Sequence, residues 1–394
     1  MIKTAFIVLF GVLTGVITGL VPGIHPNTVI FSSLAFYFSL GIDLLSYMAF
    51  IAGLSVSHTF HDFIPSIFLG APESSTALAS LPGRRMAEKG LGKVAFLYTV
   101  EGGIISVAAL LVVSPLLFIA LDSVYSLASP LMQYILLFFL LVPVFGSDNP
   151  FSALKIAGIS GLLGLVVFSI PINQEYALMP VFTGLFAVPA LLSQAMVQGD
   201  LPEQVDVEDI GYEGVKGGFM GFIAGIAAGI LPGIGGAIST YILSPFISGE
   251  KEFLAAMGAV NTTDILMSFL TLMVLGKARS GSAIALQALS SASLPQLGFV
   301  AGASLLATGI SVPLALKVSS DRVTGALDYS MLSKIVLVIV VLVSYYLAGI
   351  LGVAVLVVSS LVGTAAASRS QRRMCMAVLI VPSILFFAGI DIFI

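Results

Sequence analysis

The chain has 394 residues, of which 58% are hydrophobic and 9% are charged, and its formal net charge is −4 at pH 7. A soluble domain carries about 25% charged residues, so this chain has too few polar side chains to cover a water-facing surface. The single cysteine, Cys375, excludes an internal disulfide and a metal site built from cysteines, and the lack of a basic stripe argues against a nucleic-acid partner.

Apolar runs of about 20 residues follow one another along the chain, and each can span roughly 30 Å of hydrocarbon. These runs must be helical, because in lipid the backbone has to satisfy its own hydrogen bonds. In chain order they lie near 4–21, 27–44, 47–70, 94–121, 131–146, 153–171 and 176–196, and then near 217–231, 237–248, 253–276, 283–316, 332–347, 349–366 and 374–393. We therefore expect an all-α, multi-pass protein of the cell membrane with some broken or re-entrant helices.

Two glycine-rich segments match each other at one offset of 210 residues. The matched residues are Gly11, Gly15, Gly19, Pro22 and Gly23 in the first segment, and Gly221, Gly225, Gly229, Pro232 and Gly233 in the second. Glycines four residues apart share one helix face, which predicts close packing against another helix. A second match, from Leu69-Gly70 to Leu275-Gly276, has an offset of 206. The sequence therefore predicts two homologous repeats.

The predicted organisation is a membrane repeat at 1–197, an acidic polar linker at 198–216 and a second membrane repeat at 217–394. With about seven segments in each repeat, an odd number of crossings would invert the second repeat. Loop charge favours inversion, because the loop at 84–93 is basic, its counterpart at 287–298 is uncharged, and basic loops lie on the cytoplasmic side. Inverted repeats are typical of secondary transporters, with the binding site at the repeat interface.

Each Pro-Gly pair should interrupt its helix, since proline removes an amide donor and glycine permits positive φ. Free amides where a helix restarts carry partial positive charge and suit an anion. A short helical hairpin without a ligand is the alternative. The candidate substrate-binding residues at these breaks are Pro22, Gly23, Asn27, Thr28, Pro232, Gly233, Gly235 and Gly236.

Hydroxyl-bearing turns occupy matching places in the two halves, and their side chains can cap a half-helix or donate to an oxyanion. Lys277 and Arg279 flank the second turn and are candidates for pairing with an anion, because charges at membrane depth are costly and usually functional. A position at the water interface is the alternative for both bases. The candidate hydroxyl residues are Ser74, Ser75, Thr76, Ser280 and Ser282.

His58, His61 and Asp62 lie inside an apolar segment, and Asn261 and Asp264 lie in the equivalent segment of the second half, with Asp264 opposite His58. Asn261 is a further candidate substrate-binding residue, whereas His58, His61, Asp62 and Asp264 can relay protons or bind a coupling cation, Na⁺ or H⁺. A hydrogen-bonded contact between helices is the alternative. The chain has three histidines and no HExxH pattern, so we expect no metal site and no cofactor.

The sequence also resembles the large membrane subunit of tripartite tricarboxylate transporters, the TctA family. The resemblance lies in the paired glycine-rich helices ending in Pro-Gly, in Leu-Gly-x-Pro-x-Ser-x-x-Ala at 69–77, in Leu-Pro-Gly-Arg-Arg-Met-Ala-Glu-Lys-Gly at 81–90 and in the segment containing Asn261. It covers most of the chain. It implies a permease for citrate-like carboxylates that is driven by an ion gradient and works with a small membrane subunit and an extracytoplasmic binding protein.

The leading hypothesis is therefore secondary-active transport of an organic anion, with no enzymatic activity. One alternative is translocation of a lipid-linked polyprenyl phosphate, which needs a groove open sideways to the bilayer rather than a closed aqueous pocket. Another is an intramembrane enzyme that uses His25, His58, His61 and Asp62. The sequence is also compatible with a homodimer.

Overall fold

The computed structural model describes residues 2–21, 41–69, 80–172, 174–189, 201–205, 211–230, 236–243, 246–287, 294–319 and 329–390, with isolated positions between these ranges. Within them, all regular secondary structure is helical. Six of the described helices are long and apolar enough to cross a membrane. The protein is therefore an all-helical, multi-pass membrane protein, as the sequence predicts.

The described helices follow the predicted segments closely, and the predicted segment at 27–44 lies largely outside the described residues. The first half contains α1 (Ile2–Leu20), α3 (Leu44–His61), η1 (Pro65–Leu69), α4 (Ser80–Ala87), α5 (Gly92–Ala128), η2 (Ser129–Leu131), α6 (Met132–Phe145), α7 (Pro150–Ser169), α8 (Gln174–Phe182) and η3 (Thr183–Ala187). The second half contains α10 (Val215–Ile230), α11 (Gly236–Leu243), α12 (Glu250–Leu275), α13 (Gly281–Gln287), α14 (Leu294–Val318), α16 (Tyr329–Ala367), η5 (Arg372–Met376) and α17 (Ala377–Phe387).

The structure tests the predicted segment boundaries at two places, within 283–316 and before residue 349. The predicted segment at 283–316 was wrong as a single element, because the structure has α13 and α14 there. Pro295 lies in the first turn of α14, where its missing amide costs no helical hydrogen bond, so proline there starts a new helix. The predicted break before residue 349 is confirmed as a kink in α16 at Gly349, whose φ of 60° favours glycine.

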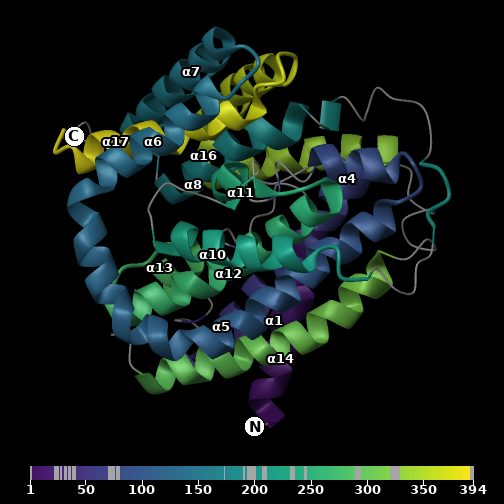
Figure 1. Ribbon diagram of the computed structural model, residues 1–394, viewed down its shortest axis with the longest axis vertical. Helices are drawn as coiled ribbons and strands as arrows, with labels where there is room; N and C mark the ends of the chain where they lie inside the picture. The colour runs from purple at the N-terminus through teal and green to yellow at the C-terminus, as the bar shows by residue number, and fades with distance from the viewer. Residues whose placement is uncertain are drawn as a thin grey trace.

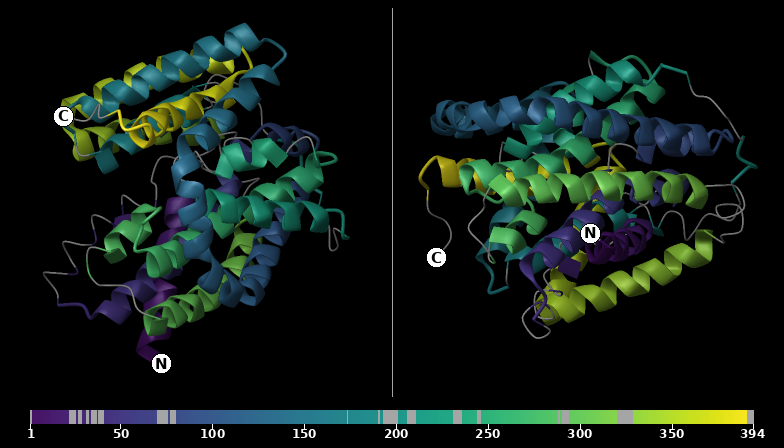
Figure 2. Two further views of the ribbon diagram at one scale, coloured as in Figure 1. Left: turned by 60° about the vertical axis from the view of Figure 1, so that its left-hand side comes forward. Right: turned by 90° about the horizontal axis from the view of Figure 1, so that it is seen from below.

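The helices form two groups, seen one above the other in the left view of Figure 2. One group consists of α1, α3, α5, α10, α12 and α14, in which α1 packs on α3, α10 and α5 pack on α12, and α14 packs on α3. The other consists of α6, α7, α8, η3, α16 and α17, with α7 on α17 and α16 on η3. In Figure 1, α7 and α17 lie at the top, and α5 and α14 lie at the bottom.

Glycines set the spacing of the tightest helix pairs in the first group. A Cβ at Gly15 of α1 would lie 2.5 Å from the carbonyl oxygen of Leu54 and 2.6 Å from Cβ of Ser57, both on α3. Gly225 of α10 meets Thr263 of α12 in the same way. The close packing predicted for the two glycine faces is confirmed, and it brings the polar side chains of neighbouring helices into contact.

Candidate functional site

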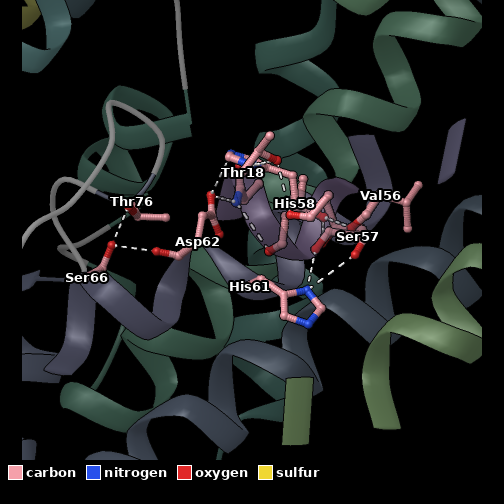
Figure 3. A network of polar contacts seen from close by, with 12 residues as sticks. Thr18, Val56, Ser57, His58, His61, Asp62, Ser66 and Thr76 are labelled. Carbon is pink, nitrogen blue, oxygen red and sulfur yellow. Dashed lines mark hydrogen bonds and ion pairs between the residues drawn. The ribbon is translucent and has the colours of Figure 1, made fainter. Parts of the chain in front are cut away.

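A buried polar network joins α1, α3 and α12 (Figure 3). The Nδ1 atom of His58 lies 3.1 Å from the hydroxyl of Thr18, and its Nε2 atom lies 3.8 Å from Oδ2 of Asp62. Asn261 donates from Nδ2 to the same Asp62 oxygen at 2.9 Å. The Asp62 carboxylate is therefore shared between an imidazole four residues earlier on the chain and a carboxamide from the second half.

The hydrogen bonds around His58 favour one assignment of its protons. Thr18 donates its hydroxyl proton to the carbonyl of Gly15 at 3.1 Å, so the hydroxyl oxygen is available to accept from Nδ1–H of His58. Nε2 then faces the Asp62 carboxylate. This contact is favourable when Nε2 also carries a proton, because the imidazole ring is then positively charged. The separation of 3.8 Å exceeds a normal hydrogen bond.

His61 is fully buried but lies outside this pair. Its Nδ1–H donates to the carbonyl of Ser57 at 2.7 Å, which leaves Nε2 as an acceptor in the neutral ring. Nε2 has no hydrogen-bond partner among the residues that the structure describes. Figure 3 shows the ring pointing away from His58 and Asp62. The structure therefore brings together two of the three predicted coupling residues of α3.

The network continues along α3 toward the chain that follows it. Ser66, in the π-helical turn η1, donates to the carbonyl of Asp62 at 2.9 Å and lies 2.6 Å from the hydroxyl of Thr76. Thr76 is fully buried. Single π-helical turns often occur at functional sites. The predicted residue Thr76 is thereby linked through Ser66 to the backbone of Asp62, the C-cap residue of α3.

The second hydroxyl turn also contacts the core. The hydroxyl of Ser280 accepts from the backbone amide of Ala283 at 3.2 Å, as expected for a residue that caps α13, and it lies 2.6 Å from the hydroxyl of Ser268. Ser282 lies 2.8 Å from the hydroxyl of Ser55 on α3. Polar side chains of the two halves thus meet at a second place.

Lys277 and Arg279 both contact the aromatic ring of Tyr125 on α5. Lys277 Nζ lies 4.0 Å from the centre of the Tyr125 ring, and Arg279 Cζ lies 5.3 Å from it. The two bases follow the end of α12 and contact Tyr125 rather than Asp62 or Asn261, while the next residue, Ser280, lies against Ser268 part-way back along α12.

Comparison with known proteins identifies the family. The model of the tripartite tricarboxylate transporter TctA family matches residues 5–378. The chain belongs to the TctA family. It is also 29% identical over 272 residues, 68% of each chain, to MJ1079, an uncharacterized protein from Methanocaldococcus jannaschii. No solved structure matches it.

Membership confirms the resemblance found in the sequence. It implies tricarboxylate transport by a tripartite system with other subunits, and the family is one of transporters rather than enzymes. Among the residues described for this TctA-family chain, no group of three or more His, Cys, Asp or Glu side chains could hold a metal ion.

Several predicted site residues of the TctA-family protein lie outside the described part of the chain. They are Pro22, Gly23, Asn27, Thr28, Ser74, Ser75, Pro232, Gly233 and Gly235. Gly236 is the first residue of α11. Asp264 is half-buried on α12 and makes no side-chain hydrogen bond to any residue that the structure describes.

Sequence reasoning missed several polar residues of the network. Thr18, Ser55, Thr59, Thr262 and Ser268 all contact a predicted site residue or one another across helices. On α3, the spacing of Ser55, Thr59 and Asp62 by three or four residues is the signal that could have found them, because it places them on one helix face.

Proposed function

We propose that this TctA-family protein is a secondary-active permease that moves a di- or tricarboxylate and couples its movement to a gradient of Na⁺ or H⁺. The observation that carries the proposal, beside the family, is the hydrogen bond between Asp62 and Asn261. It places a buried carboxylate where helices of the two halves meet, inside an apolar bundle. Ionisable groups at such depth usually mark an ion or proton pathway.

In this mechanism Asp62 is the coupling group. A proton or Na⁺ at Asp62 would neutralise the carboxylate and weaken its attraction for Asn261 and for a protonated His58. Because Asn261 lies on α12 and His58 on α3, the change in charge would alter the contact between the two halves. His61 and Asp264 are proposed as further coupling residues, since each lies within one turn of Asp62 or Asn261 on its helix.

The proposed substrate site lies next to this network, at the two helix interruptions that the sequence predicts after Pro22 and Pro232. Helix restarts after Pro22 and Pro232 would bind carboxylate oxygens through free amides, with Thr76 and Ser282 donating from their hydroxyls. The carboxylate and the coupling cation would then bind close together. Such proximity lets one charge stabilise the other, which is the simplest way to couple their movement.

We further propose that the chain consists of two inverted repeats with the limits 1–197 and 217–394, joined by the linker 198–216. Packing supports this relation. Gly11 of α1 meets Phe50 of α3, and Gly221 of α10 meets Ala256 of α12, with the partner residues 206 positions apart. The third long helix of each half lies on the other half, since α5 packs on α10 and α12 while α14 packs on α1 and α3.

The second group of helices supports the same relation. Gly164 of α7 packs against Val378 of α17, and Gly363 of α16 packs against Leu185 of η3. In each contact a glycine from one half meets a backbone carbonyl from the other. A two-fold relation between the halves accounts for both contacts at once, and it would place the site at the interface between repeats.

The test is uptake into proteoliposomes. Purified protein would be reconstituted and supplied with labelled citrate or succinate under an imposed Na⁺ or pH gradient, with a small membrane subunit and a binding protein added where available. We expect one gradient to drive accumulation in wild type and in Asp122→Asn, a control at an exposed acid of α5. Asp62→Asn should lose the gradient dependence while citrate still protects it from thermal unfolding.

The proposal would be rejected if no carboxylate protected the protein or accumulated under either gradient. Protection by short-chain polyprenyl phosphates instead would favour the alternative of a lipid-phosphate translocase. A ligand that binds only the folded state at about 100 times its Kd adds roughly 2.7 kcal/mol of stability, so thermal unfolding would detect either ligand.

A further inference from the structure

An apolar groove lies between α5, α12 and α14 in the first group of helices. Its volume is about 570 Å³, within the range of roughly 300–1,000 Å³ found for ligand pockets. Phe269, Leu270 and Val300 lie in its floor and are at most 3% exposed. Ile119 and Leu305 lie at its rim and are 77% and 39% exposed. The groove thus has a buried floor and an accessible apolar rim.

The chemistry of the groove excludes a carboxylate as its occupant. None of the described residues that line it carries a charge, and the hydroxyls of Ser114 and Ser304 are its polar side-chain groups. The Ser114 hydroxyl already donates to the carbonyl of Leu111. Because α5, α12 and α14 are among the helices able to span the membrane, an accessible apolar rim on them faces hydrocarbon. The groove is therefore suited to a hydrocarbon chain.

One end of the groove leads to the two bases on Tyr125. The helices α5 and α12 run side by side in the same direction, since Gly258 packs on Thr99 and Gly103 packs on Thr262. Tyr125 is six residues beyond Ile119, or about 9 Å along the helix. Lys277 and Arg279 contact its ring. A positively charged site therefore lies about two helical turns from the apolar groove.

The bases at this end have capacity left for an anion. The Nε and Nη2 atoms of Arg279 are buried and have no hydrogen-bond partner among the described residues. A guanidinium offers two parallel N–H groups that match the oxygens of a phosphate. The one acid within a turn of Tyr125 on α5, Asp122, is exposed and leaves the cluster with a net positive charge. Both bases lie just beyond the end of α12, where a spanning helix reaches the headgroup region.

We propose that the groove binds one acyl chain of an anionic glycerophospholipid from the surrounding bilayer, with the lipid phosphate on Lys277 and Arg279. The apolar groove binds the acyl chain, and the two bases bind the negatively charged phosphate of the lipid headgroup. Basic pockets between membrane helices bind lipid headgroups by the same combination of forces. The bound lipid joins α14 to α5 and α12. Lys277 and Arg279 contact Tyr125 on α5, whereas Ser282 of the proposed substrate site contacts Ser55 on α3.

The experiment measures the thermal unfolding midpoint of purified protein in neutral detergent. Phosphatidylglycerol, phosphatidylcholine and glycerol phosphate would each be added at the same concentration. We expect phosphatidylglycerol to raise the midpoint most and glycerol phosphate to leave it unchanged. In the double variant Lys277→Gln with Arg279→Gln, the advantage of phosphatidylglycerol over phosphatidylcholine should disappear.

A matched pair of glycine variants tests the groove itself. Gly298 and Gly302 both lie on α14 with open space where a Cβ would be, but of the two only Gly298 lines the groove. Gly298→Leu should fill the groove and abolish stabilisation by phosphatidylglycerol, while Gly302→Leu should respond like wild type. Citrate protection should be the same in all of these variants.

Several outcomes would overturn the inference. Equal stabilisation of wild type by both lipids would exclude a headgroup site, and a response to glycerol phosphate alone would show that the bases bind a free phosphate. An unchanged response in Gly298→Leu would exclude the groove. Loss of citrate protection in the double variant, with the lipid response intact, would assign the bases to the substrate site instead.

Discussion

Gly15→Ala should destabilise the protein by moving α1 away from α3. The new Cβ would lie 2.5 Å from the carbonyl oxygen of Leu54, 2.6 Å from Cβ of Ser57 and 3.0 Å from the backbone nitrogen of His58. Two of these three atoms belong to the backbone of a helix, so they cannot turn aside as a long side chain could. Real carbon atoms do not approach so closely, and the two helices must separate.

The expected magnitude follows from two opposing terms. Overpacking a tight contact costs about 1–3 kcal/mol, and the rigid backbone on α3 places this site near the upper end. Replacing glycine by alanine inside a helix returns up to about 1 kcal/mol of helix propensity. The net loss should be about 1–2 kcal/mol. Separation of the helices should also lengthen the contact between Thr18 and His58, since Thr18 lies one turn after Gly15.

The control for this prediction is Gly158→Ala on α7. A Cβ at Gly158 meets no atom within 4 Å, so the substitution keeps the gain in helix propensity and adds no clash. Unfolding by denaturant or heat in detergent would compare both variants with wild type. Gly158→Ala should be neutral or slightly stabilised. If Gly15→Ala were equally stable, the close approach of α1 and α3 would be refuted.

Three further substitutions test other contacts. Asn261→Leu removes a hydrogen bond to the buried carboxylate of Asp62, so it should cost about 1.5–3 kcal/mol in denaturant unfolding; no loss would mean that the bond is not formed. Tyr125→Leu should cost about 0.5–1 kcal/mol for each cation lost from the ring, measured in the same way. The salt bridge to Lys3 and the cap on α3 hold the pKa of Asp43 well below its usual range. Asp43 therefore adds stability above its unfolded pKa of about 3.9, and this stability is lost as the pH falls toward its folded pKa. Asp43→Ala should lower the free energy of unfolding at pH 7 by about 1 kcal/mol. It should also make the free energy of unfolding less dependent on pH in the acid range.

Most of the fold could be predicted because its determinants are local. Runs of apolar residues predicted the helices, and the break in α16 was predicted next to Gly349. The division into α13 and α14 was missed because the residues between them are small and only weakly polar. A pattern based on hydrophobicity has no strong signal at such a boundary.

The candidate site could be predicted in its members but not in their pairing. His58, Asp62 and Asn261 stood out as polar residues in apolar segments. The repeat alignment gives equivalent positions, such as His58 and Asp264, but does not say which side chains meet. The structure places His58 beside Asp62, one helical turn later. The bond from Asn261 depends on how α3 crosses α12. That crossing is set by tertiary packing and has no local signature.

The position of Thr18 suggests how a change of charge in the polar network could affect the predicted helix interruption at Pro22. Thr18 contacts His58 and lies four residues before Pro22, the predicted break in the first half. Asp62 on the same network is tied through Ser66 to Thr76, which lies in the segment of the predicted hydroxyl turn. A charge change at Asp62 would therefore act at both proposed substrate-binding segments of the first half, and through Asn261 on α12. Coupling between cation and carboxylate then needs no long pathway, because one residue stands between Asp62 and each contact: His58, 3.8 Å from the Asp62 carboxylate, leads to Thr18, and Ser66, bonded to the Asp62 backbone carbonyl, leads to Thr76.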